Sequence, residues 1–247
     1  MKPPGRRFLP FLLSVVLWGA SGVVLGITEA EQDNVYHGLD QIQSFLTSVA
    51  NSNSGFVRAD FLPTDTASYH KDIFFLKLST GVKSSDDPLK PDVLILAGLH
   101  AREWLAVEAA RMTAKYLVWS YTSCGGPPEE MAPDCEQVRY LLDHAEVWIV
   151  PVGNPDGNIY SHLHPDNKDY RFWRKNRREV EGEVRGVDIN RNFGFHWDPI
   201  IQGPVCGIQM PSASDNPGDP DYRGGNAASE LETVALQALM QGRWGRN

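Results

Sequence analysis

Apolar and polar residues alternate in blocks along the chain, and the lengths of these blocks predict strands and helices. Three short apolar runs, at 73–78, 93–97 and 147–152, have the length and composition of buried strands. The segment 104–121, between the second and third runs, carries apolar residues at helical spacing. Strand, helix and strand in this order predict an α/β sheet.

Two further segments predict helices. Residues 35–49 form an amphipathic pattern, and residues 229–241 open with Ser229 and Glu232, whose spacing is that of a capping box. The segment before the last helix, 193–226, is rich in Gly, Pro, Asn and Asp and is predicted to be loop. No change of composition divides the chain, so we predict one domain over 27–247. The apolar residues that give the helical spacing are Leu39, Ile42, Phe45 and Leu46 in the first helix, and Leu105, Ala109, Met112, Tyr116 and Trp119 in 104–121.

The N-terminus has the pattern of a secretory signal peptide. Lys2, Arg6 and Arg7 precede an apolar run over 8–27, and small residues that suit cleavage lie in its second half. The run is nearly long enough to cross a bilayer, so an uncleaved anchor is the alternative. Because glycines and serines interrupt the run, we predict a signal peptide over 1–26, a secreted protein and no stable membrane anchor.

The charge and the cysteines narrow the class of protein. A formal net charge of −8 argues against a nucleic-acid partner, and 42% apolar residues are enough to build a core. In an oxidising compartment Cys124 and Cys135, which bracket a Pro- and Gly-rich loop, could form a disulfide and leave Cys206 over. Three unpaired thiols are the alternative. No Cys-x-x-Cys motif is present, which excludes a cysteine zinc site.

A His-x-x-Glu motif follows the second predicted strand. His100 lies just past the run at 93–97, and Glu103 follows three residues later, so one turn brings imidazole and carboxylate to the same side. Nitrogen and oxygen ligands together suit zinc. Taken alone, the motif favours a simpler interpretation, which is a strand-end histidine beside a helix-capping glutamate.

The chain between Arg171 and Arg191 is locally basic. It holds seven basic and four acidic residues in a protein that is acidic overall. Guanidinium groups bind a planar carboxylate through two parallel hydrogen bonds and stay charged at physiological pH. The cluster therefore fits a carboxylate-binding pocket, and the alternative is a solvated, charged helix face.

The order and spacing of several motifs resemble one enzyme family. The motifs lie at 100–103, 154–157, 172–178 and 186–193, with family-like segments at 36–40 and 224–230. From about residue 35 to about residue 241, the chain is similar to the zinc metallocarboxypeptidases of the pancreatic carboxypeptidase A/B type. The resemblance implies a mixed β-sheet flanked by helices and one zinc ion as cofactor. It also implies hydrolysis of C-terminal amino acids from peptide or protein substrates with a free C-terminus.

The resemblance implies roles for single residues as well. His100 and Glu103 match two zinc ligands, and Arg174 matches the residue that polarises the scissile carbonyl and stabilises the oxyanion. Three residues match those that bind the substrate, the last two at its terminal carboxylate: Arg102, Asn190 and Arg191. The expected reaction is metal-assisted hydrolysis.

One part of the family's pattern is absent from this sequence. In relatives the third zinc histidine, a substrate-contacting tyrosine and the general-base glutamate follow the Ser229–Glu230 helix, and the 17 residues after Glu230 contain no histidine or tyrosine. The remaining candidates are expected on loops and not as ligands: His162, His164 and His196. We therefore expect a fold that is incomplete at its C-terminus and a 247-residue chain of low activity. The alternative is a non-catalytic fragment that binds peptide C-termini.

Overall fold

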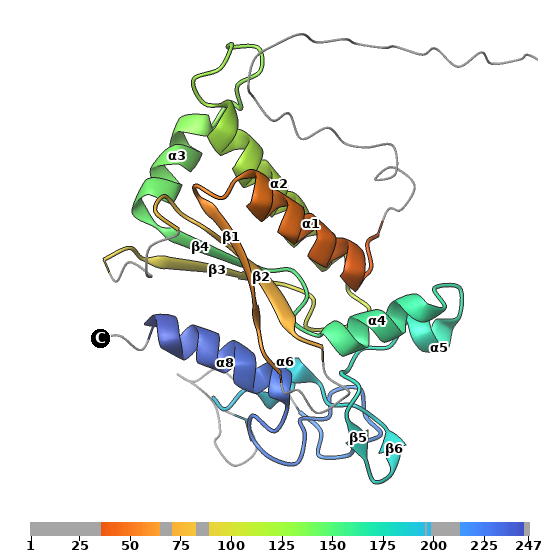
Figure 1. Ribbon diagram of the computed structural model, residues 1–247. Helices are drawn as coiled ribbons and strands as arrows, with labels where there is room; N and C mark the ends of the chain where they lie inside the picture. The colour runs from red at the N-terminus through yellow and green to blue at the C-terminus, as the bar shows by residue number, and fades with distance from the viewer. Residues whose placement is uncertain (1–35, 65–70, 83–88, 196, 199–212, 245–247) are drawn as a thin grey trace, which may run out of the picture.

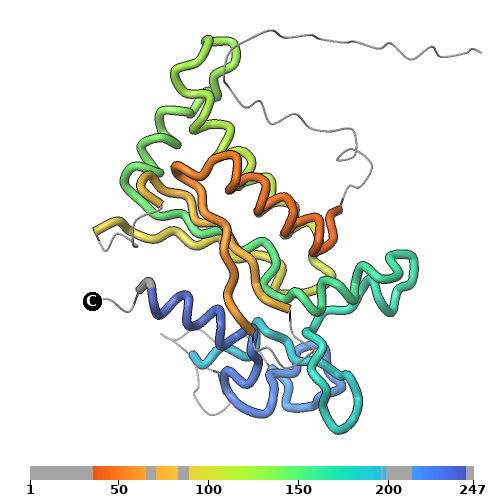
Figure 2. The backbone as a smooth tube through the Cα atoms, viewed as in Figure 1, coloured from red at the N-terminus to blue at the C-terminus, as the bar shows by residue number. Residues whose placement is uncertain are grey.

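The structure is a computed structural model (Figures 1 and 2). It describes residues 36–64, 71–82, 89–195, 197–198 and 213–244. The predicted signal peptide at 1–26, together with His196 and Cys206, lies outside these residues, so what was predicted of them stays a prediction. The described chain forms three layers, with a sheet between two sets of helices.

The middle layer of the described residues is a four-stranded sheet, with strand order β1-β2-β4-β3. Its strands are β1 (Val57–Leu62), β2 (Ile73–Leu78), β3 (Asp92–Leu96) and β4 (Glu146–Val150). β2 pairs with both β1 and β4 in antiparallel fashion, whereas β3 and β4 are parallel. The mixed sheet and the three predicted strands are thus confirmed. β1 was missed, because its outward side chains interrupt the apolar run.

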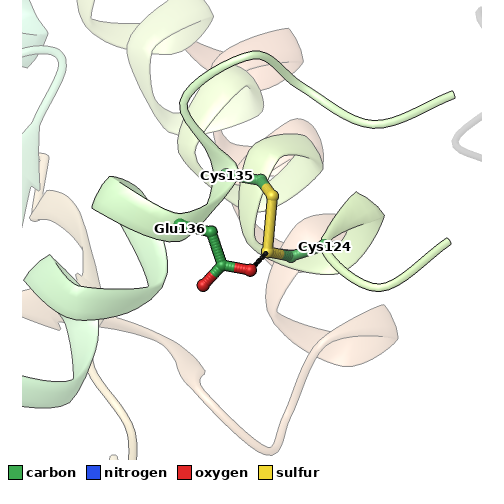
Figure 3. Close-up of side chains that lie close together, drawn as sticks. All are labelled: Cys124, Cys135 and Glu136. Atoms are coloured by element: carbon green, nitrogen blue, oxygen red, sulfur yellow. Dashed lines mark hydrogen bonds between the residues drawn. A yellow bond between two sulfur atoms is a disulfide. The ribbon is translucent and has the colours of Figure 1, made fainter. Parts of the chain in front are cut away.

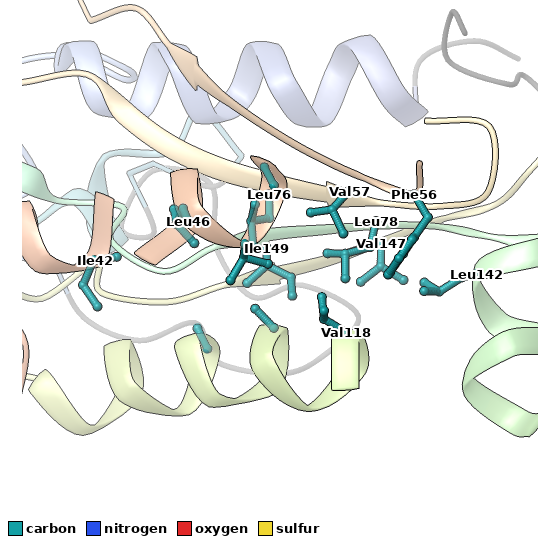
Figure 4. Close-up of a cluster of buried hydrophobic side chains, with 14 of the residues drawn as sticks. Ile42, Leu46, Phe56, Val57, Leu76, Leu78, Val118, Leu142, Val147 and Ile149 are labelled. Carbon is teal, nitrogen blue, oxygen red and sulfur yellow. The ribbon is translucent and has the colours of Figure 1, made fainter. Parts of the chain in front are cut away.

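Three helices cover one face of the sheet, α1 (Leu39–Ser52), α2 (Trp104–Ser123) and α3 (Cys135–His144). Successive strand residues point to opposite faces, and every second residue of β2 and β4 points to this one. Together they form the main apolar core, in which α2 lies opposite the sheet (Figure 4). Its fully buried members include Ile42, Leu46, Leu76, Leu142, Val147 and Ile149.

The other face of the sheet is covered by α8 (Leu231–Trp244), next to the short helix α6 (Ile189–Asn192). A second apolar cluster joins α8 to the remaining alternate residues of β2 and β4. Its members include Ile73, Phe75, Trp148, Val150 and Leu236. The helix predicted over 229–241 is confirmed, although it begins at Leu231 and extends to Trp244.

Two helices and a hairpin follow β4. Helix α4 (Pro155–Leu163) begins after Asn154, whose side chain accepts a hydrogen bond from the third residue of the helix, with proline in the first position. Helix α5 (Lys168–Arg171) comes next, and then the hairpin of β5 (Glu179–Val180) and β6 (Glu183–Val184). None of these elements was predicted, and the Asp-, Pro- and Asn-rich sequence around α4 had suggested a loop.

The apolar stripe of α2 that suggested a helix faces outward. Leu105 is 70% exposed, and Met112, Tyr116 and Trp119 are each more than 40% exposed. The buried side of the same helix carries Trp104, Val107, Ala110, Ala114 and Val118. The prediction of a helix is right, but its visible stripe marks the wrong face, because the small residues that pack on the sheet give a weaker signal.

The structure joins Cys124 and Cys135 in a disulfide, which links the end of α2 to the start of α3 (Figure 3). The carboxylate of Glu136 lies against the Cys124 sulfur. The predicted pairing of the first two cysteines is therefore confirmed. Among the helices of the described residues, none is both long and apolar enough to cross a bilayer.

Candidate functional site

The motif segments contain two tight backbone crossings, one at Gly98 just after β3 and one at Gly186. Gly98 has a φ of +63°, and a Cβ atom on it would lie 2.7 Å from the carbonyl oxygen of Pro151. Gly186 has a φ of +69°, and a Cβ atom there would collide with the carbonyl oxygen of Asn176. A residue with a side chain fits neither position. Gly98 thereby fixes the path of the chain two residues before His100.

His100 is buried and engaged at both ring nitrogens. Its Nδ1 atom lies 2.8 Å from Oε1 of Glu103, and its Nε2 atom lies 3.2 Å from Oδ1 of Asp188. The side chain of Glu103 is 49% exposed, whereas that of Asp188 is completely buried. The structure therefore places the predicted pair side by side, with one open side at the glutamate.

Asp188 joins two motifs that are far apart in the sequence. Its Oδ1 atom also accepts the backbone N–H of Asn190 at 2.9 Å, and its Oδ2 atom accepts Nε and Nη2 of Arg174 at 3.1 and 2.8 Å. Burial alone would raise the pKa of Asp188, but the hydrogen bonds from His100 and Arg174 and the charge of Arg174 outweigh burial and hold this pKa below its ordinary value. Asp188 is therefore an anion between these two side chains at neutral pH.

Two of the predicted substrate-binding residues, Asn190 and Arg191, follow Asp188 in the chain, and the third, Arg102, follows His100. Asn190 is exposed on α6, and Arg191 follows on the same turn, where its Nη1 atom donates to the carbonyl oxygen of Asn190 at 3.1 Å. Arg102 lies between the histidine and the glutamate in the chain and is exposed. Its carbonyl oxygen accepts a hydrogen bond from Arg171 at 2.9 Å.

Other cations of the basic segment have structural partners. The guanidinium of Arg171 lies 3.7 Å from the ring centroid of Trp104, and that of Arg177 lies 3.5 Å from the ring of Tyr160. The Lys175 ammonium is buried and donates to two backbone carbonyl oxygens at 2.8 Å. Each of these three cations has a partner within the described residues, and the carboxylate pocket stays a prediction for the other arginines of the segment.

His162 and His164 do not join the site. His162 lies in the last turn of α4, so the predicted loop is wrong there, and its ring stacks on Trp104 with centroids 4.0 Å apart. Its Nδ1 atom is bonded to the carbonyl oxygen of Asn158 at 2.9 Å, and burial lowers its pKa. His164 ends the helix and is exposed. His162 therefore packs against α2, and His164 lies at the surface, away from His100.

The donor set at His100 and Glu103 fits part of a zinc site. The two potential ligand atoms face each other, and a carboxylate on the far ring nitrogen is the usual support of a metal-binding histidine. Asp188 contacts the other ring nitrogen, and in the part of the chain that the structure describes no third residue completes a metal-binding group with His100 and Glu103. The group of three that does occur there consists of Cys124, Cys135 and Glu136, and its two sulfurs are bonded to each other.

Asp188 was not among the site residues predicted from the sequence. A signal was nonetheless present, because this aspartate stands between two apolar residues, Val187 and Ile189, directly before a short helix. Asp188 caps this helix from a completely buried position, and a buried carboxylate requires hydrogen-bond donors. In this structure two of those donors are the side chains of His100 and Arg174.

A histidine–glutamate pair thus lies beside a buried aspartate and an arginine, next to a mixed sheet between helices. The sequence profile described as zinc carboxypeptidase matches residues 42–246, and the chain belongs to this family. It is 30% identical over 211 residues to zinc carboxypeptidase A 1 of Drosophila melanogaster, a match that covers 85% of this chain and 42% of the relative. The chain thus spans less than half the length of that relative.

Two further comparisons agree with this assignment. The chain is 31% identical over 210 residues to carboxypeptidase A1 of Mus musculus, which covers 85% of this chain and 42% of that protein. Among solved structures, bovine thrombin-activatable fibrinolysis inhibitor in complex with tick carboxypeptidase inhibitor superposes with a TM-score of 0.60 and 28% identity. That match covers 84% of this chain and 56% of the other.

Proposed function

We propose that this protein is a secreted zinc metallocarboxypeptidase, which removes C-terminal amino acids from peptides and proteins that have a free C-terminus. The observation that carries the proposal is the carboxylate of Asp188, which contacts His100, Arg174 and the backbone of Asn190. One buried anion thereby connects a metal-ligand pair to an oxyanion donor and to the turn that would bind a terminal carboxylate.

His100 and Glu103 would supply two of the zinc ligands. Because Nε2 of His100 is bonded to Asp188, the other ring nitrogen, Nδ1, faces Oε1 of Glu103 and is the ligand atom. Zinc, when bound, polarises the scissile carbonyl and acidifies a water molecule. The name of the Drosophila melanogaster relative and the description of the family both include zinc, which supports the same cofactor here.

The arginines would bind the substrate at two places. Asp188 holds Arg174 through Nε and Nη2, and a donor that is already fixed in place stabilises a developing oxyanion without reorganisation. Asn190 and Arg191, on the exposed turn beside it, would bind the terminal carboxylate and restrict cleavage to the last residue. Arg102 is proposed to contact the substrate further from the scissile bond.

The predicted signal peptide at 1–26 would direct the remaining domain, 27–247, to the outside of the cell. The disulfide between Cys124 and Cys135 supports this part of the proposal, since disulfides persist in oxidising compartments. The described residues offer two facing zinc-ligand atoms without a third, and this favours the second candidate function, binding of peptide C-termini without hydrolysis.

A pair of peptides that differ only at the C-terminus, free acid against amide, separates these functions. With zinc present, we expect the 247-residue chain to bind the free acid at least about tenfold more tightly than the amide. Release of the last amino acid, abolished by a chelator, indicates the enzyme. Binding without release indicates the second candidate, and equal affinity for acid and amide contradicts both.

Arginine variants locate the binding site. Arg191→Ala is expected to weaken binding of the free acid, and Arg174→Ala is expected to lower kcat on the order of a hundredfold in a preparation that releases amino acids. Arg58→Ala is the matched control, because Arg58 lies on β1 and faces Asp60. The assigned roles are wrong if both site variants change the same kinetic parameter to the same extent.

A further inference from the structure

Behind Arg174 and Asp188 lies a buried polar network that the zinc chemistry does not use. Its centre is Asn176, which is completely buried and has hydrogen-bond partners at all its polar atoms. It lies two residues after Arg174, and its backbone N–H donates to the carbonyl oxygen of Val187, next to Asp188.

The amide of Asn176 is oriented by what surrounds it. Its Oδ1 atom accepts the backbone N–H of Val187 at 2.7 Å and that of Arg178 at 3.2 Å. The Nδ2 atom must therefore face the opposite way, where it donates to Oε2 of Glu230 at 2.7 Å and lies 3.3 Å from Oε2 of Glu232. The oxygen of this amide accepts from N–H groups, and its nitrogen donates to a carboxylate. A carboxylic acid in its place would put an acceptor where the amide now has a donor.

The two glutamates lie at the start of α8, and both are buried. Glu230 is 2% exposed and Glu232 is fully buried. Glu230 is further held by the hydroxyl of Ser229, which donates to Oε1 at 2.7 Å, and by Oδ1 of Asn192, which accepts its backbone N–H at 3.1 Å. Asn192 ends α6, the helix that carries the predicted carboxylate-binding residues. A buried carboxylate needs such donors, so these contacts fix where α8 begins.

We propose that Asn176 is a positioning residue, which through Glu230 couples the start of α8 to the two chain segments that hold Arg174 and Asp188. The inference rests on the proposed function for the catalytic meaning of Arg174, but the coupling itself is a property of the fold. When the link between Asn176 and Glu230 is broken, the ion pair between Arg174 and Asp188 should loosen.

The Nε–H group of Arg174 reports on this coupling directly, because it donates to Asp188. In the 15N-labelled 247-residue chain, its NMR signal is assigned by its loss in Arg174→Lys, and its hydrogen exchange is then measured. In Asn176→Asp, which keeps the shape but sets a carboxylate against Glu230, we expect exchange to become faster by about tenfold. In Asn176→Asp with Glu230→Gln, which restores one donor and one acceptor, part of this increase should be reversed.

Two further variants separate coupling from general instability. Val49→Ala removes volume from the fully buried side of α1, on the other face of the sheet, and should lower the unfolding midpoint without changing the exchange of Arg174. Glu230→Leu alone replaces Asn176→Asp if the latter does not fold, because an amide at position 230 would still offer an oxygen to Asn176. The proposal is overturned if the single variants stay within about twofold of the wild type, if Val49→Ala has an equal effect, or if the double variant recovers nothing.

Peptide binding is measured on the same samples. If the wild type fails to distinguish the free acid from the amide while Asn176→Asp still loosens Arg174, the proposed function is wrong and the coupling stands. If the wild type distinguishes them and Arg174 is unaffected by Asn176→Asp, the coupling is wrong and the proposed function stands.

Discussion

The two faces of the sheet are held by different kinds of interaction. On the face covered by α1, α2 and α3, aliphatic side chains pack against alternate residues of β2 and β4. On the other face α8 contributes a smaller apolar cluster, and the chain around its start is held by buried amides and carboxylates, among them Asn176, Asn192 and Glu230. The candidate site adjoins the second face.

This difference concerns two properties of the protein, the stability of its fold and the positions of the side chains at the candidate site. Apolar packing is non-directional and tolerates small rearrangements, whereas a hydrogen bond between buried groups fails when its partners shift by a fraction of an ångström. The first face should therefore set how stable the protein is, and the second should set where Arg174 and His100 lie. Variants that affect one property without the other test this division.

The largest effect is expected on the apolar face. Leu46 is fully buried between α1 and the sheet, and Leu46→Ala should lower the free energy of unfolding by about 3 kcal/mol, because it removes apolar contacts and leaves a cavity. Urea unfolding measures this loss, and zinc binding of the folded variant should be unchanged. Leu163→Ala, at a site that is 56% exposed, is the control. A loss below about 1 kcal/mol contradicts close packing at this position.

At the polar face, Asp188→Asn should cost about 2 kcal/mol, since it weakens hydrogen bonds from two side chains to a buried anion. Its effect on the site should be larger than its effect on stability. Because the carboxylate supports His100, we expect zinc affinity to fall about tenfold or more, measured by competition with a chromophoric chelator. Asp60→Asn, on an exposed part of β1, serves for comparison, and equal zinc affinity in the two variants would remove Asp188 from the site.

A pH dependence is expected at the contact of α2 with the segment before α1. Burial by itself would raise the pKa of Glu108, but hydrogen bonds from Arg111 and His37 outweigh it and lower the pKa from its ordinary value of 4.5. Glu108 therefore contributes stability that is present above pH 4.5 and is lost as the pH falls through its lowered pKa in the folded protein.

Glu108→Gln should accordingly remove about 1.5 kcal/mol of stability at pH 7 and progressively less as the pH falls below 4.5. Urea unfolding at a series of pH values gives the two curves. The attribution to Glu108 fails if the curves of variant and wild type stay parallel down to pH 3.

The smallest effect is expected on the outer side of α2. Met112 is 50% exposed, so Met112→Lys should change the free energy of unfolding by no more than about 0.5 kcal/mol. The same substitution at Ala110, which is 3% exposed, would place a charge between α2 and the sheet and should lower the midpoint of thermal unfolding well below that of Met112→Lys. If both variants unfold alike by thermal melting, the orientation of α2 is wrong.

The sequence patterns correctly predicted those parts of the fold where apolar residues are concentrated. The runs that became β2 and β4 are almost entirely buried between helices, and such strands are read directly from composition. The run that became β3 lies at the edge of the described sheet and is only partly buried, so its apolar composition was the whole signal. The outward stripe of α2 misled because large exposed residues, such as Met112 and Trp119, outweigh Ala110 and Ala114 in any count of hydrophobicity. Packing on a sheet at close range selects small side chains, and periodicity alone does not show this.

The candidate site could be predicted only in part for a different reason. His100 and Glu103 are near in the sequence, so their proximity follows from one turn of chain. The contact from His100 to Asp188 joins residues 88 positions apart, and that from Asn176 to Glu230 joins residues 54 apart. Local patterns carry no information on such pairs, which exist only because the sheet and α8 bring their segments together.

The two glycines at the backbone crossings, Gly98 and Gly186, also bear on how this gene tolerates change. At each, a side chain would meet a carbonyl oxygen of the main chain, which has no other conformation to adopt, whereas a Cβ atom at Gly55 has nothing within 4 Å. In a library that varies every codon and is selected for folded protein, positions 98 and 186 should return glycine alone, while position 55 should accept many amino acids. Glycines at different positions of this sequence therefore differ in how freely they can be substituted, and the difference depends on whether another segment of backbone lies against them.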